Sequence, residues 1–208
     1  MAKVLITSGP TREYLDPVRY LSNASSGRMG SALAEAFLTA GHEVWVISGP
    51  VEIAYPRGCR VQYVTTTEEM LAAAIELFAE CDGVIGAAAP CDFRPAVVAN
   101  DKIAKTGEGL CLRLVETPDI LAALAADKRG RWIVGFALET RDGPARALRK
   151  MQRKQCDLII LNHPAAIRSD ETEITAFAPD GGTLGTFIGS KKDAARRIYC
   201  WVEDRLLR

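Results

Sequence analysis

Histidine is scarce in this sequence of 208 residues, which contains only His42 and His163. Two histidines exclude a metal site built mainly from imidazole ligands. Cys-x-x-Cys pairs are also absent, because the six cysteines are scattered along the chain. Dispersed cysteines without an export signal are typical of a reduced protein, so we expect a cytoplasmic location.

Long apolar runs and an excess of one charge are missing too. No apolar run reaches the roughly 18 residues that suggest a membrane span. The first residues, MAKVLIT, lead directly into a predicted strand, so we expect no signal peptide. Lys plus Arg and Asp plus Glu number 26 each, which argues against nucleic acid as the main partner. We therefore expect neither a membrane partner nor a nucleic-acid partner.

Two signatures of dinucleotide enzymes are absent as well. The sequence contains neither Gly-x-Gly-x-x-Gly nor the Tyr-x-x-x-Lys pair of short-chain dehydrogenases. A dinucleotide binder needs an acidic residue for the ribose after its second strand, where this chain has Ser48 and Gly49. These absences argue against an NAD(P)- or flavin-dependent oxidoreductase, which stays an alternative beside a non-catalytic nucleotide-binding subunit.

Apolar, strand-like runs alternate with helix-period runs along most of the chain. The pattern predicts strands at Val4–Thr7, Glu43–Ser48, Val61–Thr65, Val84–Ala88, Trp132–Ala137 and Leu158–Asn162, and helices at Gly27–Ala40, Glu68–Glu80, Pro118–Asp127 and Pro144–Gln155. Apolar strands separated by helices indicate a parallel sheet that is covered on both faces. Thr66 and Glu69 have capping-box spacing, and Pro118 suits the first position of its helix.

The C-terminal part has a different pattern. EITAFAPDGGTLGTFI predicts an antiparallel hairpin over about 173–188, and Ser190 caps a last helix that ends near Leu207. We therefore predict one α/β domain over 1–208. Its fold class is a Rossmann-like, doubly wound, mostly parallel sheet with helices on both faces and an antiparallel hairpin at one edge.

Two connections are far longer than the 2–6 residues or so that βα units usually need. GPTREYLDPVRYLSNASSGRMG follows the first strand at 9–30, and APCDFRPAVVANDKIAKTGEG follows the fourth at 89–109. In the commonest doubly wound order, ligands bind outside the carboxyl ends of these two strands, where the winding reverses. We therefore predict that both connections meet at one crevice, with the second forming a flap over about 90–110.

The first connection carries groups that suit an anion. Ser25, Ser26 and Gly27 open a predicted helix, whose N-terminal N–H groups can bind a phosphate, although an ordinary Ser N-cap would have the same pattern. Arg19, like Arg12, could clamp a carboxylate or be solvated. Asn23 could bond a ligand or form a turn.

The flap and a later helix carry lysines. Lys102 and Lys105 lie in a loop with nearby glycines and could close over a polyphosphate, or could be solvated. Lys150 and Lys154 are four residues apart and share a helix face. Most basic helical stripes are simply solvated.

The fourth strand ends in GAAAP at 86–90, which is almost without side chains. Such a strand end lets a ligand lie against the backbone or lets a helix pack closely. Cys91 and Asp92 follow directly. We interpret Cys91 as a small buried thiol and not as a nucleophile.

Five segments match one family in order and spacing: ITSGPTREYLDPVRYLSNASSGRMG, AAAPCDF, DKIAK, ETPDIL and VGFALET. Through them nearly the whole chain resembles phosphopantothenate–cysteine ligase, the phosphopantothenoylcysteine synthetase of coenzyme A biosynthesis, in a free-standing bacterial form. The resemblance implies that 4'-phosphopantothenate and L-cysteine are joined with CTP and Mg²⁺ through an acyl-CMP. Because the chain begins at the ligase, we expect no flavin, and a separate phosphopantothenoylcysteine decarboxylase is a further candidate partner.

The resemblance also implies residue roles. Asn23 would contact the pantothenoyl group and assist the second step, for which its amide could hold a developing oxyanion. Arg19 would reach the substrate across the interface of a homodimer with shared active sites, and Lys102 would act from the flap. Substrate contacts are expected from Arg19, Asn23, Ser25, Ser26, Gly27, Ala88, Ala89 and Asp92. Nucleotide contacts are expected from Gly86, Ala87, Ala88, Asp92, Lys102, Pro118, Asp119, Ile120, Leu121, Phe136, Lys150 and Lys154.

The metal ligands are not assigned by the resemblance, and the sequence departs from the family pattern at two places. Ala104 stands where a lysine is common in the flap, which bears on how tightly the flap holds the nucleotide. PCDF stands where VADY or VSDF is usual.

Overall fold

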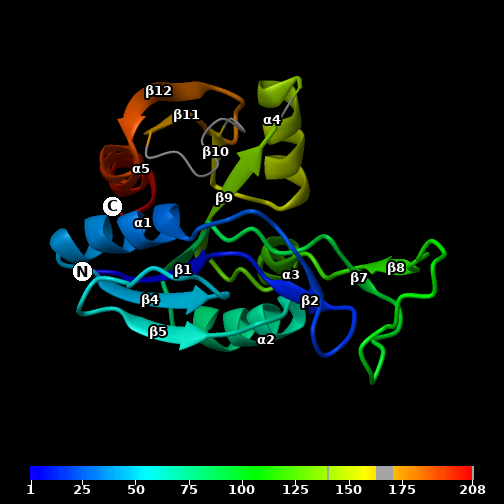
Figure 1. The fold of residues 1–208 in the computed structure, drawn as a ribbon. Coiled ribbons are helices and arrows are strands. Elements are labelled where there is room, and N and C mark those ends of the chain that lie inside the picture. The colour runs from blue at the N-terminus through cyan, green and yellow to red at the C-terminus, as the bar shows by residue number, and fades with distance from the viewer. Residues whose placement is uncertain (140, 163–170, 208) are drawn as a thin grey trace.

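The structure is a computed structural model that describes residues 1–139, 141–162 and 171–207 (Figure 1). Its strands are β1 (Lys3–Ser8), β2 (Arg12–Tyr14), β3 (Tyr20–Ser22), β4 (Glu43–Ser48), β5 (Arg60–Tyr63), β6 (Gly83–Gly86), β7 (Phe93–Pro95), β8 (Leu114–Glu116), β9 (Trp132–Leu138), β10 (Leu158–Asn162), β11 (Glu171–Phe177) and β12 (Thr183–Ser190). Its helices are α1 (Arg28–Thr39), α2 (Thr67–Phe78), α3 (Ile120–Ala126), α4 (Gly143–Arg153) and α5 (Lys191–Leu206). No helix within the described ranges is long and apolar enough to cross a membrane.

Eight strands form one sheet in the order β12-β11-β10-β9-β6-β1-β4-β5. Six neighbouring strands of this sheet pair in parallel, namely β10, β9, β6, β1, β4 and β5. β11 and β12 add an antiparallel edge. From β1 the chain winds outward to β5, returns to β6 beside β1, and then winds outward on the other side. The predicted fold class is therefore confirmed, and the winding reverses between β1 and β6 as expected.

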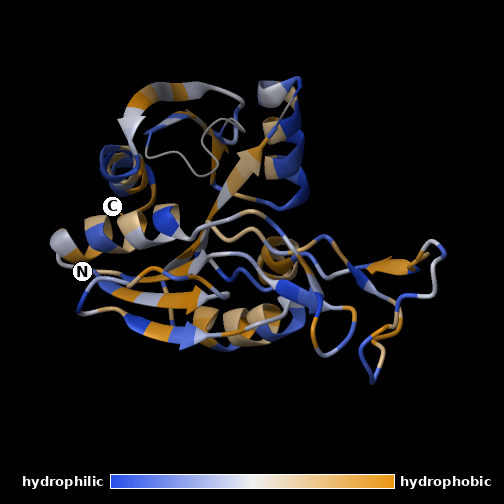
Figure 2. Cartoon of the chain, viewed as in Figure 1, coloured by the Kyte–Doolittle hydropathy of each residue, from blue (hydrophilic) through white to orange (hydrophobic). Residues whose placement is uncertain are grey.

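Helices cover both faces of the sheet (Figure 1). Phe37 of α1 and Ile198 of α5 belong to the core on one face, while Met70 of α2, Leu124 of α3 and Met151 of α4 belong to the core on the other. Figure 2 shows that the strands are mainly hydrophobic and that α4 has one hydrophilic side. Burial of the apolar helix faces against the sheet is the main source of stability for such a layered fold.

Two small ribbons were not predicted from the sequence. β2 pairs with β3 inside the first long connection, and β7 pairs with β8 around the flap. Figure 1 shows the β7–β8 ribbon extending away from the main sheet. Each of the four strands has only three residues, which is too short for a recognisable period of alternation.

The helix starts confirm one prediction and correct another. Thr66 and Glu69 form the predicted capping box at α2. Asp119, however, caps α3 by accepting a hydrogen bond from the N–H of Ala122 at 3.2 Å. Pro118 therefore precedes the cap and is not the first helical residue, because the capping carboxylate fixes where the helix begins.

Candidate active site

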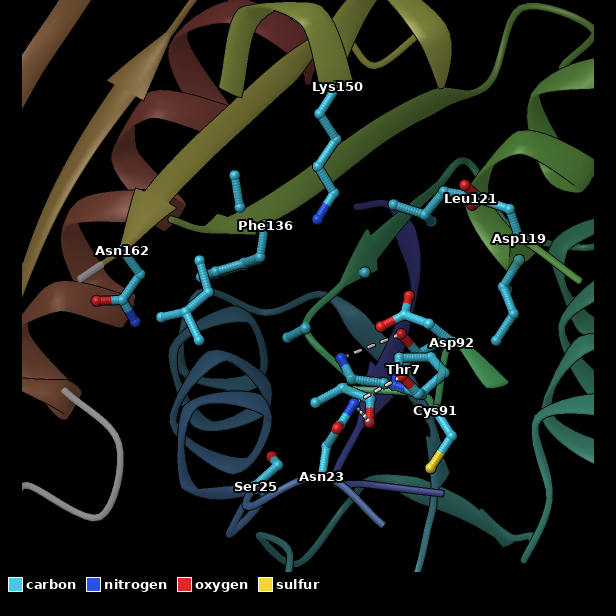
Figure 3. Close-up of a pocket in the computed structure, with 18 of the residues that line it drawn as sticks. Thr7, Asn23, Ser25, Cys91, Asp92, Asp119, Leu121, Phe136, Lys150 and Asn162 are labelled. Atoms are coloured by element: carbon cyan, nitrogen blue, oxygen red, sulfur yellow. Dashed lines mark hydrogen bonds between the residues drawn. The ribbon is translucent and has the colours of Figure 1, made fainter. Parts of the chain in front are cut away.

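A cleft of about 1140 Å³ lies at the carboxyl ends of the central strands (Figure 3). One side is formed by residues 23–30 and the other by residues 116–121 and the cleft-facing side of α4. The floor is formed by residues 86–92 and by Phe136. The cleft therefore occupies the predicted switch point.

Backbone hydrogen bonds join the two long connections along the cleft. Ala87 donates its N–H to the carbonyl oxygen of Thr7 at 3.1 Å, and Ala89 donates to Gly9 at 2.9 Å. Pro10 and Ala89 also form an isolated parallel bridge. The two connections thus continue the pairing of β1 with β6 beyond the sheet, and they meet as the sequence predicts.

Asn23 links these connections with its side chain. Its Nδ2 donates to the carbonyl oxygens of Ala89 at 3.3 Å and Pro90 at 2.8 Å. Carbonyl oxygens only accept, so the amide nitrogen must face them, and Oδ1 is left for a ligand. This arrangement differs from the expectation that the amide N–H groups would hold an oxyanion, because the strand end has already engaged them.

The start of α1 opens onto the same cleft. Its N-cap is Gly27, with φ of 73°, and no side chain caps the helix. The alternative of an ordinary Ser N-cap is therefore wrong. A left-handed φ suits glycine, and a helix start without a side-chain cap leaves backbone donors for an anion.

The opposite wall carries an ion pair. Lys154 Nζ lies 3.0 Å from Oδ1 of Asp119, and Arg153 Nη2 lies 3.9 Å from Oδ2. Asp119 also caps α3, so one carboxylate joins the start of α3 to the end of α4. The positive charge of Lys154 is consequently partly balanced before any ligand binds.

Lys150 differs from Lys154. Its ammonium group points into the cleft (Figure 3), and among the described residues no carboxylate lies within ion-pair distance of it. Burial lowers the pKa of Lys150, and the nearby charge of Lys154 lowers it further, against the opposing effect of Glu139, Asp119 and Asp92. A half-buried cation without a carboxylate partner in the described part of the chain is a candidate binding group for an anion in the cleft.

The small residues at the end of β6, at 86–90, have a role in packing. A Cβ atom added to Gly86 would lie 2.7 Å from Cδ1 of Leu121, so the glycine lets α3 pack closely against β6. Ala88 and Phe136 nevertheless line the cleft and give it an apolar floor. The packing alternative is confirmed for Gly86, and a ligand can still lie against the alanines beyond it.

Acidic groups in the cleft are few. Asp92 is exposed at the mouth, with its carboxylate turned toward the interior (Figure 3). In the described part of the chain, no three His, Cys, Asp or Glu side chains are grouped closely enough to hold a metal ion. A cation in this cleft would therefore depend on oxygens that a ligand supplies.

Three candidate residues lie outside the cleft. Arg12 stacks on the ring of Tyr20, with its guanidinium carbon 4.5 Å from the ring centroid. Arg19 Nη2 lies 2.7 Å from Oδ2 of Asp16, and Lys102 is exposed on the flap. The structure thus groups Asn23, Ser25, Ser26, Gly27, Gly86, Ala87, Ala88, Ala89, Asp92, Pro118, Asp119, Ile120, Leu121, Phe136, Lys150 and Lys154 in one cleft, without Arg19 and Lys102.

Cys91 is a structural residue, as predicted. It is buried, its Sγ donates to the carbonyl oxygens of Thr11 and Leu21, and its N–H donates to Oγ1 of Thr11 at 2.9 Å. Burial raises the pKa of the Cys91 thiol. A thiol that stays protonated is a poor nucleophile.

Several lining residues were not singled out from the sequence. Arg28 follows Gly27 at the start of α1, so its position was available as a signal. Asn162 and Lys191 come from the end of β10 and the start of α5. Asn162 reaches the cleft because β10 pairs in parallel with β9, so its place at the end of a predicted strand was a signal, whereas nothing local marks Lys191.

A model of one protein family matches nearly the whole chain. Its description is DNA/pantothenate metabolism flavoprotein C-terminal domain, and it matches residues 1–206. Coenzyme A biosynthesis bifunctional protein CoaBC of Vibrio parahaemolyticus is 40% identical over 203 residues, covering 94% of this chain and 50% of the relative. CoaBC of Escherichia coli K12 is 42% identical over 186 residues, covering 86% and 46%. The chain thus spans about half the length of the curated relatives it matches.

Solved structures resemble the fold closely. The crystal structure of a CoaBC C-terminal domain has a TM-score of 0.86 at 33% identity, covering 99% of this chain and 96% of that one. A complex of the Cab2 H337A mutant with phosphopantothenate-cysteine has a TM-score of 0.79, covering 98% of this chain and 86% of that one. At 19% identity, the second likeness concerns the fold alone.

The lowered pKa of Lys150 predicts how the binding of an anion in the cleft depends on pH, and a nucleoside triphosphate serves as the probe. The ammonium group is charged below its pKa and loses its charge as pH rises through it, earlier than a lysine of the ordinary value of 10.5. We therefore expect the Kd for a triphosphate to increase over the alkaline range in the native protein. In the Lys150→Arg variant it should stay flat, because arginine remains protonated. Calorimetric titration from neutral pH upward measures both, and an identical alkaline increase in the two proteins would contradict the assignment.

Proposed function

Because the chain belongs to the family of the DNA/pantothenate metabolism flavoprotein C-terminal domain, we propose that it is a phosphopantothenate–cysteine ligase of coenzyme A biosynthesis. Its substrates are 4'-phosphopantothenate, L-cysteine and CTP, and its products are 4'-phosphopantothenoylcysteine, CMP and pyrophosphate. The observation that carries the proposal is the single cleft that holds most of the family-like motifs. The relatives' shared name, coenzyme A biosynthesis bifunctional protein, supports it.

The reaction proceeds in two balanced steps. In the first, a carboxylate oxygen of phosphopantothenate attacks the α-phosphorus of CTP, and pyrophosphate leaves with the electrons of the broken P–O bond. In the second, the cysteine amine attacks the acyl carbon, CMP leaves with the electrons of the C–O bond, and the nitrogen loses a proton. Both reactants of the first step are anions, so positive charge must hold them together.

The cleft supplies that charge from two sides. Lys150 and Lys154 face the side where the triphosphate would lie, and the uncapped start of α1 offers backbone donors on the other. No residue needs to become a covalent nucleophile, and catalysis rests on positioning and electrostatics. Bound Mg²⁺ would offset phosphate charge, and it needs few protein carboxylates where a triphosphate supplies oxygens, so Asp92, an exposed carboxylate of the cleft, would help to hold it.

Asn23 takes part in the second step through its oxygen. With Nδ2 held by Ala89 and Pro90, Oδ1 is the atom that can accept a hydrogen bond from the cysteine amine. Such a bond orients the nitrogen toward the acyl carbon and stabilises the positive charge that develops as the amine attacks.

A homodimer completes the proposed enzyme. The turn between β2 and β3 and the β7–β8 ribbon expose the side chains of Val18, Tyr20, Phe93, Val97, Val98, Leu110, Leu112 and Leu114. So many exposed apolar residues on two neighbouring ribbons are typical of an interface. Arg19 and Lys102 belong to the same extension, and a second copy would bring them to a cleft. The cytoplasmic location, and a decarboxylase as a fused or separate partner, remain parts of this proposal.

A nucleotide-dependence assay tests the proposed function. The purified protein is given phosphopantothenate, cysteine, Mg²⁺ and each of the four common ribonucleoside triphosphates. The bare strand end leaves backbone groups to read the base, and hydrogen-bonded recognition discriminates strongly, so we expect kcat/KM for CTP to exceed that for ATP by about tenfold or more. Equal turnover with ATP would contradict the CTP preference. No pyrophosphate release with any triphosphate would favour the non-catalytic subunit, and a coloured, flavin-bearing protein would favour the oxidoreductase.

The Asn23→Asp variant separates the two steps. Aspartate has nearly the same shape and keeps an acceptor oxygen, but it cannot donate to the carbonyl oxygens of Ala89 and Pro90, so that oxygen is no longer held toward the cysteine amine. It also places a negative charge beside the phosphoanhydride. We expect pyrophosphate release in a single turnover, accumulation of acyl-CMP by mass spectrometry, and a loss of adduct formation of about a hundredfold or more. Asn23→Ser keeps a small polar side chain without the charge and serves as the comparison. Normal adduct formation by Asn23→Asp would remove Asn23 from the second step.

Hybrid dimers test the shared active site. Arg19→Gln is mixed, under conditions that exchange subunits, with Lys150→Ala, because Lys150 lines the cleft of its own chain. If Arg19 acts on the partner, we expect about a quarter of the native activity, since random mixing makes about half of the dimers hybrid and one of their two sites is intact. Mixing Arg19→Gln with Arg19→Ala is the control and restores nothing. A monomer in solution, or no recovery in hybrids shown to form, would contradict the shared site.

A further inference from the structure

Asp16 is a charged side chain for which the proposed reaction has no task. It lies in the turn between β2 and β3, outside the cleft, and its exposed fraction is 0%. A fully buried carboxylate is costly unless several donors surround it. Its surroundings therefore indicate what it holds in place.

The donors around Asp16 come from two segments that are far apart in the sequence. Oδ1 accepts the N–H groups of Val18 and Arg19, both at 2.8 Å. Oδ2 accepts the N–H of Ile103 at 3.1 Å and pairs with Nη2 of Arg19 at 2.7 Å. The first pair closes the local turn, and the second reaches the middle of the flap.

Arg19 completes a two-point clamp on the flap. The same Nη2 donates to the carbonyl oxygen of Ile103, so both backbone polar groups of Ile103 are bound. Between residues 100 and 114, Ile103 is half-buried, whereas the other residues are exposed. The neighbouring N–H of Ala99 also donates to the carbonyl oxygen of Leu15 at 2.9 Å. The turn that carries Asp16 is thus the support on which the middle of the flap rests.

We propose that Asp16 is a positioning residue that, together with Arg19, clamps the backbone of Ile103 and so fixes the flap that presents Lys102 and Lys105. The inference rests on the proposed function only in assigning these lysines to the nucleotide. It gives Arg19 a task within its own chain in addition to the one proposed across the interface. A carboxylate suits the task, because it can accept backbone and guanidinium donors at once.

The negative charge of Asp16 is present over the whole neutral pH range. Burial alone would raise the pKa of Asp16, but the hydrogen bonds from Val18, Ile103 and Arg19 and the charge of Arg19 outweigh it and lower the pKa to about 2. A carboxylate whose pKa is lower in the folded protein than in the unfolded chain stabilises the folded state when the pH is above the unfolded pKa. Asp16 loses this contribution only as the pH falls toward 2. The carboxylate is therefore ionised throughout the neutral range.

The test compares Asp16→Asn with Asp101→Asn. Both variants remove one negative charge near Lys102, but Asp101 is exposed and has no part in the clamp. Hydrogen–deuterium exchange of residues 99–105 should be about tenfold to a hundredfold faster in Asp16→Asn, as expected for loss of bonds to a charged group, and unchanged in Asp101→Asn. The KM for CTP should increase about fivefold or more in Asp16→Asn, while the KM for cysteine changes less than about twofold.

Two outcomes would overturn the clamp. One is native exchange of the flap in Asp16→Asn, and the other is an equal rise in both KM values, which indicates a general loss of structure. If Asp16→Asn does not fold, Arg19→Met keeps an unbranched side chain but has no donor for Asp16 or Ile103, so its flap must also exchange faster. Exchange is measured without substrate. A native protein that makes no product would therefore count against the proposed function and leave the clamp to be judged on exchange alone.

Discussion

The parallel pairing of β1 with β6 is the constraint on which the site depends. These strands are neighbours in the sheet although the chain leaves β1 in one direction and β6 in the other. Their carboxyl ends therefore point to the same edge, and the bonds Ala87–Thr7 and Ala89–Gly9 carry the pairing into the two connections. Asn23 then bonds across the same seam. Residues 23–30 and 86–92 of the cleft lining lie along this seam or directly beside it.

Much of the fold could be predicted because its elements carry their own signals. Five of the six parallel strands are mainly apolar and buried, β5 being the exception, and the capping box at Thr66 is local. The helix predicted at 27–40 matches α1 to within one residue, but its cap could not be predicted, because Gly27 is left-handed at a place where a Cβ would meet Val51 and no serine hydroxyl caps the helix. The ribbons β2–β3 and β7–β8 also escaped prediction. Their three-residue strands are held by contacts with one another, which no local period records.

The positions of the site residues could be predicted from motifs and from the order of the strands. The pairing of their charges could not, because it depends on tertiary packing. Spacing placed Lys150 and Lys154 on one helix face, but only packing makes Lys154 a partner of Asp119 and leaves Lys150 half-buried in the cleft without a described carboxylate partner. A partly desolvated cation without a partner destabilises the folded protein unless a ligand anion compensates it. A charge that folding alone would not favour is therefore best explained by binding.

The other candidate site residues lie in two parts of the structure, the cleft and the extension formed by the β2–β3 turn and the β7–β8 ribbon. The cleft contains its own lysines, helix start and asparagine, whereas Arg19 and Lys102 lie on an extension with exposed apolar side chains. An extension that projects from the sheet has little core of its own, so its shape must come from polar bonds, and Asp16 provides the buried ones. The exposed apolar side chains would be covered in the proposed homodimer. A rigid turn would then hold Arg19 and Lys102 at a fixed position relative to the cleft of the other copy. The polar clamp and the apolar surface thus serve the proposed homodimer together, because the first shapes the extension and the second would join it to a neighbouring copy.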